Sequence, residues 1–158
     1  MPLSQNLRER INLVVSKCET RQAALLPVLH EVQNELGWLP QEAVEEVAEI
    51  LGLSPAGVQS VTTFYTMFFT KPVGRHVMWV CRTLPCALMG AEHVIECISQ
   101  KLGIEHGETT PDGKFTLLEA ECLAACGSSP VMLVGEELYV NLTKKKIDEI
   151  IEKLRKKE

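Results

Sequence analysis

Four cysteines stand in two close pairs, an arrangement that can hold a metal or a redox centre. Four residues separate Cys81 from Cys86, and three separate Cys122 from Cys126. A further 35 residues lie between the two pairs. Thiols at such spacings can form disulfides, bind a zinc ion or bind an iron–sulfur cluster. The pattern therefore predicts one of these three kinds of site.

The spacing does not favour the three sites equally. Thioredoxin-type exchange uses C-x-x-C, in which one thiol attacks and the other resolves, and neither pair has that spacing. Structural zinc sites most often have two residues between paired cysteines. A [2Fe–2S] cluster takes four thiolates, and the wider C-x4-C and C-x3-C loops suit it, although they differ from the plant-type ferredoxin run. The spacing favours [2Fe–2S], with zinc left as the open alternative.

Composition excludes several other classes of function. The formal net charge is −5 and no basic stretch precedes the C-terminus, so we expect no nucleic-acid partner. No apolar run approaches the ~20 residues needed to span a bilayer, so we expect no direct membrane insertion. The N-terminus lacks a cationic start followed by an apolar core, which predicts a cytosolic start rather than a signal peptide. Six cysteines in a cytosolic chain indicate metal or redox chemistry more than disulfides.

Residues 1–72 predict a helical bundle, the first of two domains. Gly37 suits a helix C-terminus, and Ser54 and Pro55 suit the N-cap and first position of a short fourth helix. Apolar residues recur at helical spacing in three stripes: Leu3, Leu7, Ile11 and Val15; then Leu25, Val28, Leu29, Val32 and Leu36; then Val44, Val47, Ala48 and Leu51.

Residues 73–158 predict a second domain with a different pattern. HVMWVC (76–81) and FTLLEAE (115–121) read as strands, and 131–140 reads as a hairpin around Gly135-Glu136. A helix is predicted from about Ala87 to Gly103, with Leu88 in its apolar stripe, and a last helix is capped by Asn141 or Thr143. One small sheet covered by two helices satisfies this order, so the fold class is α+β.

The predicted elements bring the cysteine pairs together. Cys81 ends the first strand and Cys122 ends the second, and strand ends of one small sheet lie side by side. The two loops can then present four sulfurs to one centre. Arg82 is the only fixed positive charge in either loop. Small residues let the backbone approach the sulfurs and donate N–H groups to them: Ala87, Ala124, Ala125, Gly127 and Ser128.

The sequence also resembles a known family over nearly its whole length. C-x4-C followed by CLxxC, with VxVC before the first pair and a proline after the second, resembles the small [2Fe–2S] subunit of respiratory complex I and related subunits of soluble NAD-linked hydrogenases and formate dehydrogenases. LGWLP (36–40) and VxxVTTFYTMFFTKPVG (58–74) extend the resemblance into the helical half. Spacing alone does not separate complex I from the other two assemblies.

The resemblance implies a thioredoxin-like ferredoxin domain after a helical bundle. It implies that Cys81, Cys86, Cys122 and Cys126 ligate one [2Fe–2S] cluster, and that the chain itself carries no catalytic residue. It also implies a stable heterodimer with a flavoprotein subunit that holds FMN, the NADH site and a [4Fe–4S] cluster. Further peripheral-arm subunits, electron delivery towards quinone and a place on the bacterial cytoplasmic face follow from it. The cluster then lies beside the flavin and off the main electron path.

The absence of nucleotide-binding motifs agrees with NADH and FMN sites on a partner subunit. It contains neither a G-x-G-x-x-G run nor a Walker A loop, so nothing predicts nucleotide binding by this subunit alone. Two rival functions remain: a zinc-stabilised interaction module and a free-standing ferredoxin. The 70-residue helical extension argues against the ferredoxin, because a soluble shuttle does not need it.

Three positions depart from the family pattern. Ala124 stands where glycine is usual, Arg82 where a small or hydroxyl residue is common, and Ser129 where alanine or glycine is usual. None of them removes a thiol. Ser129 carries a hypothesis: its hydroxyl perturbs the local backbone, the cluster potential or the adjoining flavin site.

The remaining reactive or aromatic residues have plainer interpretations. Cys97 is predicted to be a buried, inert thiol and Cys18 a structural one, and the four histidines share no ligand spacing. TFYTMFF (63–69) has two interpretations, an exposed partner-binding patch or core filling between the halves. The two can hold for different side chains of this segment.

Overall fold

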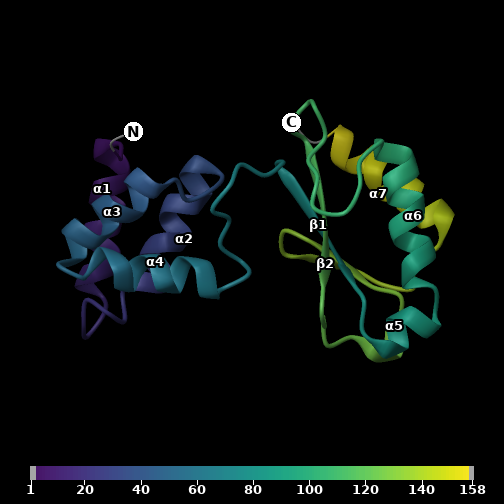
Figure 1. Ribbon diagram of the computed structural model, residues 1–158, viewed down its shortest axis with the longest axis horizontal. Helices are drawn as coiled ribbons and strands as arrows, with labels where there is room; N and C mark the ends of the chain where they lie inside the picture. The colour runs from purple at the N-terminus through teal and green to yellow at the C-terminus, as the bar shows by residue number, and fades with distance from the viewer. Residues whose placement is uncertain (1–2, 157–158) are drawn as a thin grey trace. The chain divides into compact units, whose positions relative to one another are not determined.

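The computed structural model describes residues 3–156 and divides into two compact units, with the division between Pro72 and Val73 (Figure 1). Residues 1, 2, 157 and 158, at the outer ends of the two predicted domains, lie outside the described residues. Within residues 3–156 no helix is both long and apolar enough to cross a bilayer.

The first unit is helical. Its helices are α1 (Gln5–Ser16), α2 (Leu25–Leu36), α3 (Gln41–Leu51) and α4 (Pro55–Phe64). The predicted stripes form one core, since most of their members are buried together: Leu3, Leu7, Ile11, Leu25, Val28, Leu29, Val32, Val44, Val47, Ala48 and Leu51. Val15 and Leu36 are only partly buried at its edge.

The predicted helix ends are also confirmed. Gly37 ends α2 with a φ of +82°, a left-handed conformation that glycine adopts without a Cβ clash. Ser54 stands at the N-cap of α4 and Pro55 at its start, although the Ser54 side chain makes no capping hydrogen bond. Backbone geometry and proline therefore define this helix start.

The side chains of TFYTMFF lie in two different environments. Phe68 is buried in the helical core, with its ring centroid 5.0 Å from that of His30. Phe64 is 77% exposed, and Tyr65 and Met67 are also exposed. The segment thus anchors the end of this unit through one ring and leaves other apolar side chains at the surface.

The second unit is a four-stranded sheet with helices on one face (Figure 1). Its strands are β1 (His76–Cys81), β2 (Phe115–Ala120), β3 (Met132–Val134) and β4 (Glu137–Tyr139), in the order β2-β1-β3-β4. The β1–β2 pair is parallel and the other two pairs are antiparallel. The two strands and the Gly135-Glu136 hairpin are confirmed.

Helices α5 (Leu84–Leu88) and α6 (Ala91–Leu102) connect the parallel strands, and α7 (Lys144–Arg155) closes the unit. Parallel neighbours need such a crossover connection. Side chains of α6 and α7 pack with β1, β2 and β3 in a single core. At the surface Lys101 of α6 donates to Asp148 of α7 over 2.7 Å, which raises the pKa of Lys101. Thr143 caps α7 by accepting from the N–H of Lys146.

The continuous helix predicted from Ala87 to Gly103 is wrong. The structure starts α5 earlier, at Leu84, and breaks the segment at Gly90, whose φ is +91°. A residue in this left-handed conformation cannot continue a right-handed helix. With this break α5 contributes no residue to the core that α6 covers, and Leu88 is 77% exposed rather than part of the apolar stripe.

Gly74 makes a close backbone approach at the start of the second unit. A Cβ at this position would lie 2.6 Å from the carbonyl carbon of Phe115 and 2.8 Å from its nitrogen. The Gly74 N–H also donates to Oγ1 of Thr116 over 2.6 Å. Space, rather than a positive φ, therefore requires glycine here.

We expect Gly74→Ala to destabilise the second unit by about 1–3 kcal/mol, because the extra methyl forces the backbone of β2 to shift. That corresponds to a melting temperature lower by roughly 4–8 °C per kcal/mol. Differential scanning calorimetry measures it. Gly57→Ala is the matched control, since Gly57 lies in α4 with its nearest neighbour 3.8 Å from the added Cβ. This control should be neutral or stabilising, and equal losses in both variants would contradict the steric argument.

Candidate functional site

The two cysteine loops begin at the same end of neighbouring parallel strands. Cys81, the last residue of β1, pairs with Ala120, the last residue of β2. Cys122 follows two residues later. The N–H of Cys81 donates to Val131 O over 3.1 Å, and that of Arg82 donates to Ala120 O over 2.9 Å. Backbone hydrogen bonds on both sides thus hold the start of the first loop, and the predicted meeting of strand ends is confirmed.

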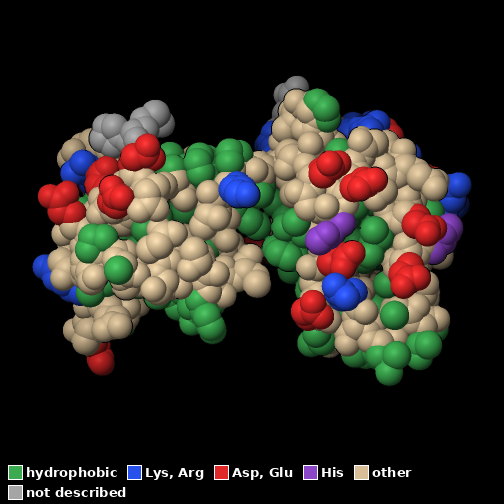
Figure 2. All heavy atoms as spheres, in the orientation of Figure 1, with side chains coloured by type: hydrophobic (Ala, Val, Ile, Leu, Met, Phe, Trp, Pro, Cys, Tyr) green, Lys and Arg blue, Asp and Glu red, His purple; other side chains and the backbone are tan. Residues whose placement is uncertain are grey.

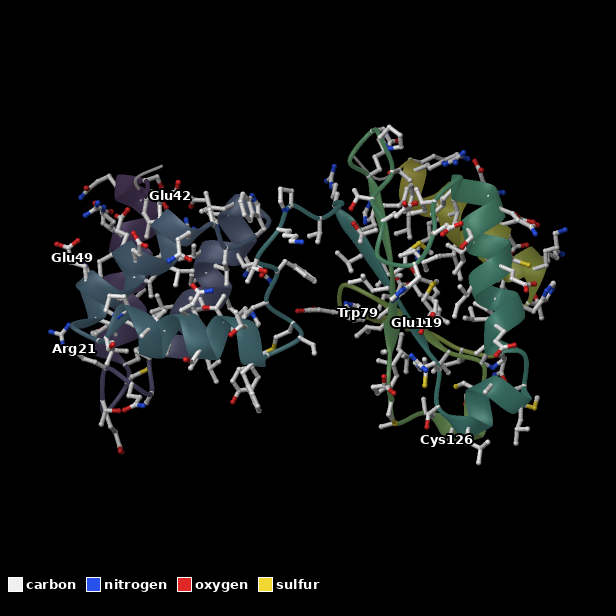
Figure 3. All side chains as sticks on the ribbon, viewed as in Figure 1. Arg21, Glu42, Glu49, Trp79, Glu119 and Cys126 are labelled. Atoms are coloured by element: carbon white, nitrogen blue, oxygen red, sulfur yellow. The ribbon has the colours of Figure 1, made fainter. Side chains whose placement is uncertain are left out.

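The second cysteine of each pair lies on a short helical turn. Cys86 is in α5, and Cys126 opens the 3-10 turn η1 (Cys126–Ser128). In Figure 3 Cys126 lies at the same end of the sheet as α5. The two loops meet in a small apolar cluster separate from the main core, made of Cys81, Cys86, Ala91 and Val131, with Leu123, Ala125 and Val140 packed against it.

The four thiols differ in exposure. Cys81 and Cys86 are buried, whereas Cys122 and Cys126 are exposed. All six cysteines of the chain fall within the described residues, and all are free thiols. Within residues 3–156 no three Cys, His, Asp or Glu side chains form a closed metal-binding group. The two loops pack against the same small cluster, with one cysteine pair buried and the other exposed.

The donors of these loops fit a thiolate-bound cluster. Iron–sulfur clusters of this kind are bound by cysteine sulfurs, and the two loops together provide four of them. The N–H of Ala124 already donates to Sγ of Cys122 over 3.3 Å. Such backbone donors stabilise the negative charge on cluster sulfurs. The arrangement can therefore hold a redox group at the surface end of the sheet.

Residues 11–155 match the model of the family described as Thioredoxin-like [2Fe-2S] ferredoxin. The chain belongs to this family. A [2Fe–2S] cluster is accordingly the cofactor, and electron transfer is the class of function. The α+β fold and the resemblance noted in the sequence are confirmed.

Curated relatives of this ferredoxin-family chain are subunits of one kind of oxidoreductase complex. The chain is 42% identical over 149 residues to an NADH-quinone oxidoreductase subunit of Rhizobium meliloti (strain 1021), covering 94% of this chain and 89% of that one. It is 37% identical over 151 residues to an NADH-quinone oxidoreductase subunit of Escherichia coli (strain K12), covering 96% and 91%. Both matches extend over the helical unit as well as the ferredoxin unit.

A solved structure shows the same fold at low sequence identity. An air-oxidized NAD+-reducing [NiFe]-hydrogenase superposes with a TM-score of 0.73 and 22% identity. The match covers 83% of this chain, which spans only 22% of the hydrogenase chain. The likeness concerns the fold.

Ala124 departs from the ferredoxin-family pattern at a position where the backbone conformation favours glycine. Its φ is +55°, a left-handed conformation in which a Cβ costs about 1 kcal/mol or more. We expect Ala124→Gly to stabilise the second unit by about 1 kcal/mol, or roughly 4–8 °C in melting temperature. Calorimetry of the cluster-loaded chain measures this. Ala125→Gly is the control, because Ala125 has a φ of −122° and gains nothing from glycine; a matching rise there would contradict the assignment of strain to Ala124.

Arg82, the second departure, is compensated by neighbouring carboxylates. Its Nη1 lies 3.2 Å from Oε2 of Glu119 and 3.9 Å from Oε1 of Glu121, and the side chain is exposed. A paired and solvated guanidinium has little net field on nearby sulfurs. The fixed positive charge expected in the loop is therefore largely cancelled.

The other thiols lie apart from this centre. Cys97 is buried on α6, with Sγ 3.5 Å from Nε2 of His93, and Cys18 packs half-buried against the helical core. The predicted burial of Cys97 is confirmed. Two features of the centre are not predicted by the sequence: Ser129 Oγ lies 3.3 Å from Sγ of Cys86, and apolar side chains of α5 are exposed. The exposed surface could have been foreseen only from the left-handed break at Gly90.

Proposed function

We propose that this chain is the [2Fe–2S] electron-transfer subunit of the NADH dehydrogenase module of a respiratory NADH:quinone oxidoreductase. One observation carries the proposal. In a chain of the thioredoxin-like [2Fe–2S] family, two neighbouring parallel strands are each followed by a loop with two cysteines, and the two loops pack together. The names of relatives 37–44% identical over most of the chain support it.

The proposed ligands are Cys81, Cys86, Cys122 and Cys126. The cluster, when bound, supplies one-electron oxidation and reduction. The chain's own residues hold and shield it: β1 fixes Cys81, α5 buries Cys86, and the exposed pair closes the site from the loop after β2. We propose further that the two compact units are distinct domains, a helical domain of residues 1–72 and a ferredoxin domain of residues 73–158.

The proposed partner is the flavoprotein subunit that carries FMN, the NADH site and a [4Fe–4S] cluster. Leu84, Leu88 and Met89 are exposed on and beside α5, the helix that also carries the buried Cys86. Figure 2 shows hydrophobic side chains gathered at the end of the second unit where Figure 1 places α5. Exposed apolar side chains beside a redox centre suit a permanent subunit contact, since they exclude water where the two chains meet. The complex would lie on the cytoplasmic face of a bacterial membrane, with this cluster beside FMN and off the main path to quinone.

Metal analysis separates the cluster from zinc. The full chain, purified anaerobically, should contain about two irons and two acid-labile sulfides, and dithionite should produce a spin-half EPR signal. Tetrahedral zinc without sulfide would overturn the proposal. Co-expression with the flavoprotein subunit then tests the partner. A stable one-to-one complex is expected, whereas a chain that remains a separate monomer would support the free-standing ferredoxin instead.

A further inference from the structure

Ser129 joins the two cysteine loops through its side chain. It is 7% exposed, and its Oγ lies 3.3 Å from Sγ of Cys86, which is fully buried. The same Oγ donates to the backbone carbonyl of Cys126 over 2.9 Å. One hydroxyl thus contacts a proposed ligand sulfur from the first loop and the backbone of a proposed ligand from the second.

Cluster ligation changes the hydrogen bonds that Ser129 and Cys86 can form. The Cys86 thiol of the cluster-free chain can donate a hydrogen bond to Ser129 Oγ, while the Ser129 hydroxyl donates its own hydrogen bond to the Cys126 carbonyl. A cluster ligand is a thiolate, so Sγ of Cys86 becomes an acceptor only. The single Ser129 proton then has two acceptors within reach. Charge strengthens a hydrogen bond, and burial strengthens it further, so the anionic sulfur is the favoured acceptor.

We propose that the Ser129 hydroxyl donates a hydrogen bond to the cluster-bound sulfur of Cys86 and raises the cluster's reduction potential. The inference rests on the proposed cluster ligation. Reduction adds one negative charge that spreads onto the sulfurs, and a donor stabilises the reduced form more than the oxidised form. Ser129 is a positioning residue, because it acts through a ligand rather than on iron.

We expect this position to tolerate loss of the hydroxyl. Alanine or glycine is usual there in the family that the sequence resembles, so Ser129→Ala keeps a side chain compatible with the fold. Ser128→Ala is the matched control, because Ser128 belongs to the same loop and is only partly buried. Ser129→Thr retains a hydroxyl and tests rescue.

The experiment compares anaerobically purified full-length chains by EPR-monitored redox titration and by resonance Raman spectroscopy in H₂O and D₂O. Ser129→Ala should lower the midpoint potential, with a severalfold fall in the ratio of reduced to oxidised cluster at a fixed solution potential. It should also lose the part of the deuterium shift in the Fe–S(Cys) stretches that arises from the hydroxyl. Wild type, Ser128→Ala and Ser129→Thr should agree with one another.

The outcomes separate this inference from the proposed function. If Ser129→Ala keeps both the potential and the deuterium shift of wild type, the hydroxyl stays on the Cys126 carbonyl and the inference is overturned. A changed potential with an unchanged deuterium shift overturns it too, because the effect is then purely structural. If Ser129→Ala does not retain the cluster, Ser129→Gly is measured with the same expectations. Absence of iron and sulfide from wild type would instead defeat the proposed function.

Discussion

Cys86→Ala is expected to abolish the cluster, with iron and acid-labile sulfide falling from about two each per chain to background. Cys86 is the most enclosed of the four proposed ligands, being fully buried in α5. The other sulfur in the apolar cluster around it cannot replace the missing thiolate, because Cys81 is itself a proposed ligand. Alanine is preferred to serine in this test, since a serine oxygen can itself bind iron.

Two further variants separate ligation from packing. Cys97→Ala also removes a buried sulfur from the second unit. It therefore leaves a cavity like that of Cys86→Ala, but not at the proposed cluster site. Cys122→Ala removes an exposed sulfur, so it removes a ligand without creating a cavity. We expect Cys97→Ala to keep the cluster and Cys122→Ala to lose it. Iron and sulfide assays with EPR measure both, and the reverse pattern would show that burial, rather than ligation, decides cluster content.

Much of the second unit could be predicted because short apolar runs there have few alternatives. HVMWVC is too short for a buried helix and rich in β-formers, and it forms β1 over the same residues. Gly135-Glu136 between two apolar segments forms the hairpin, with Gly135 at a φ of +58°. Because β1 and β2 are parallel neighbours, their ends bring the two cysteine loops together.

Hydrophobic periodicity could not predict two features: the exposure of Leu88, which follows a local backbone break, and the Ser129–Cys86 contact, which forms where two loops pack together. Leu88 fits the helical spacing of Ala91 and Val94, and only the left-handed Gly90 moves it to the surface. The Ser129–Cys86 contact joins residues 43 positions apart. Neither loop's own sequence specifies that contact, because it arises when both loops close over the same end of the sheet.

The exposed surface of α5 gives the second large effect. We expect the double substitution Leu84→Asp with Leu88→Asp to weaken binding to the proposed partner, the flavoprotein subunit, by at least about 100-fold, or about 2.7 kcal/mol. The two leucines are 69% and 77% exposed and lie four residues apart, so they share one helix face. Burying two carboxylates in an apolar contact removes their hydration without supplying partners.

A matched change at another exposed leucine distinguishes an interface from a general effect of charge. Leu138 lies on β4 in the same unit and is 41% exposed, so Leu138→Asp adds a carboxylate away from α5. Titration calorimetry with the purified flavoprotein subunit should give near wild-type affinity for this control. Iron content should be unchanged in all three chains, because none of these side chains binds the cluster. Equal weakening by Leu138→Asp, or undiminished binding by the double variant, would place the partner on another surface and leave the apolar face of α5 unexplained by subunit contact.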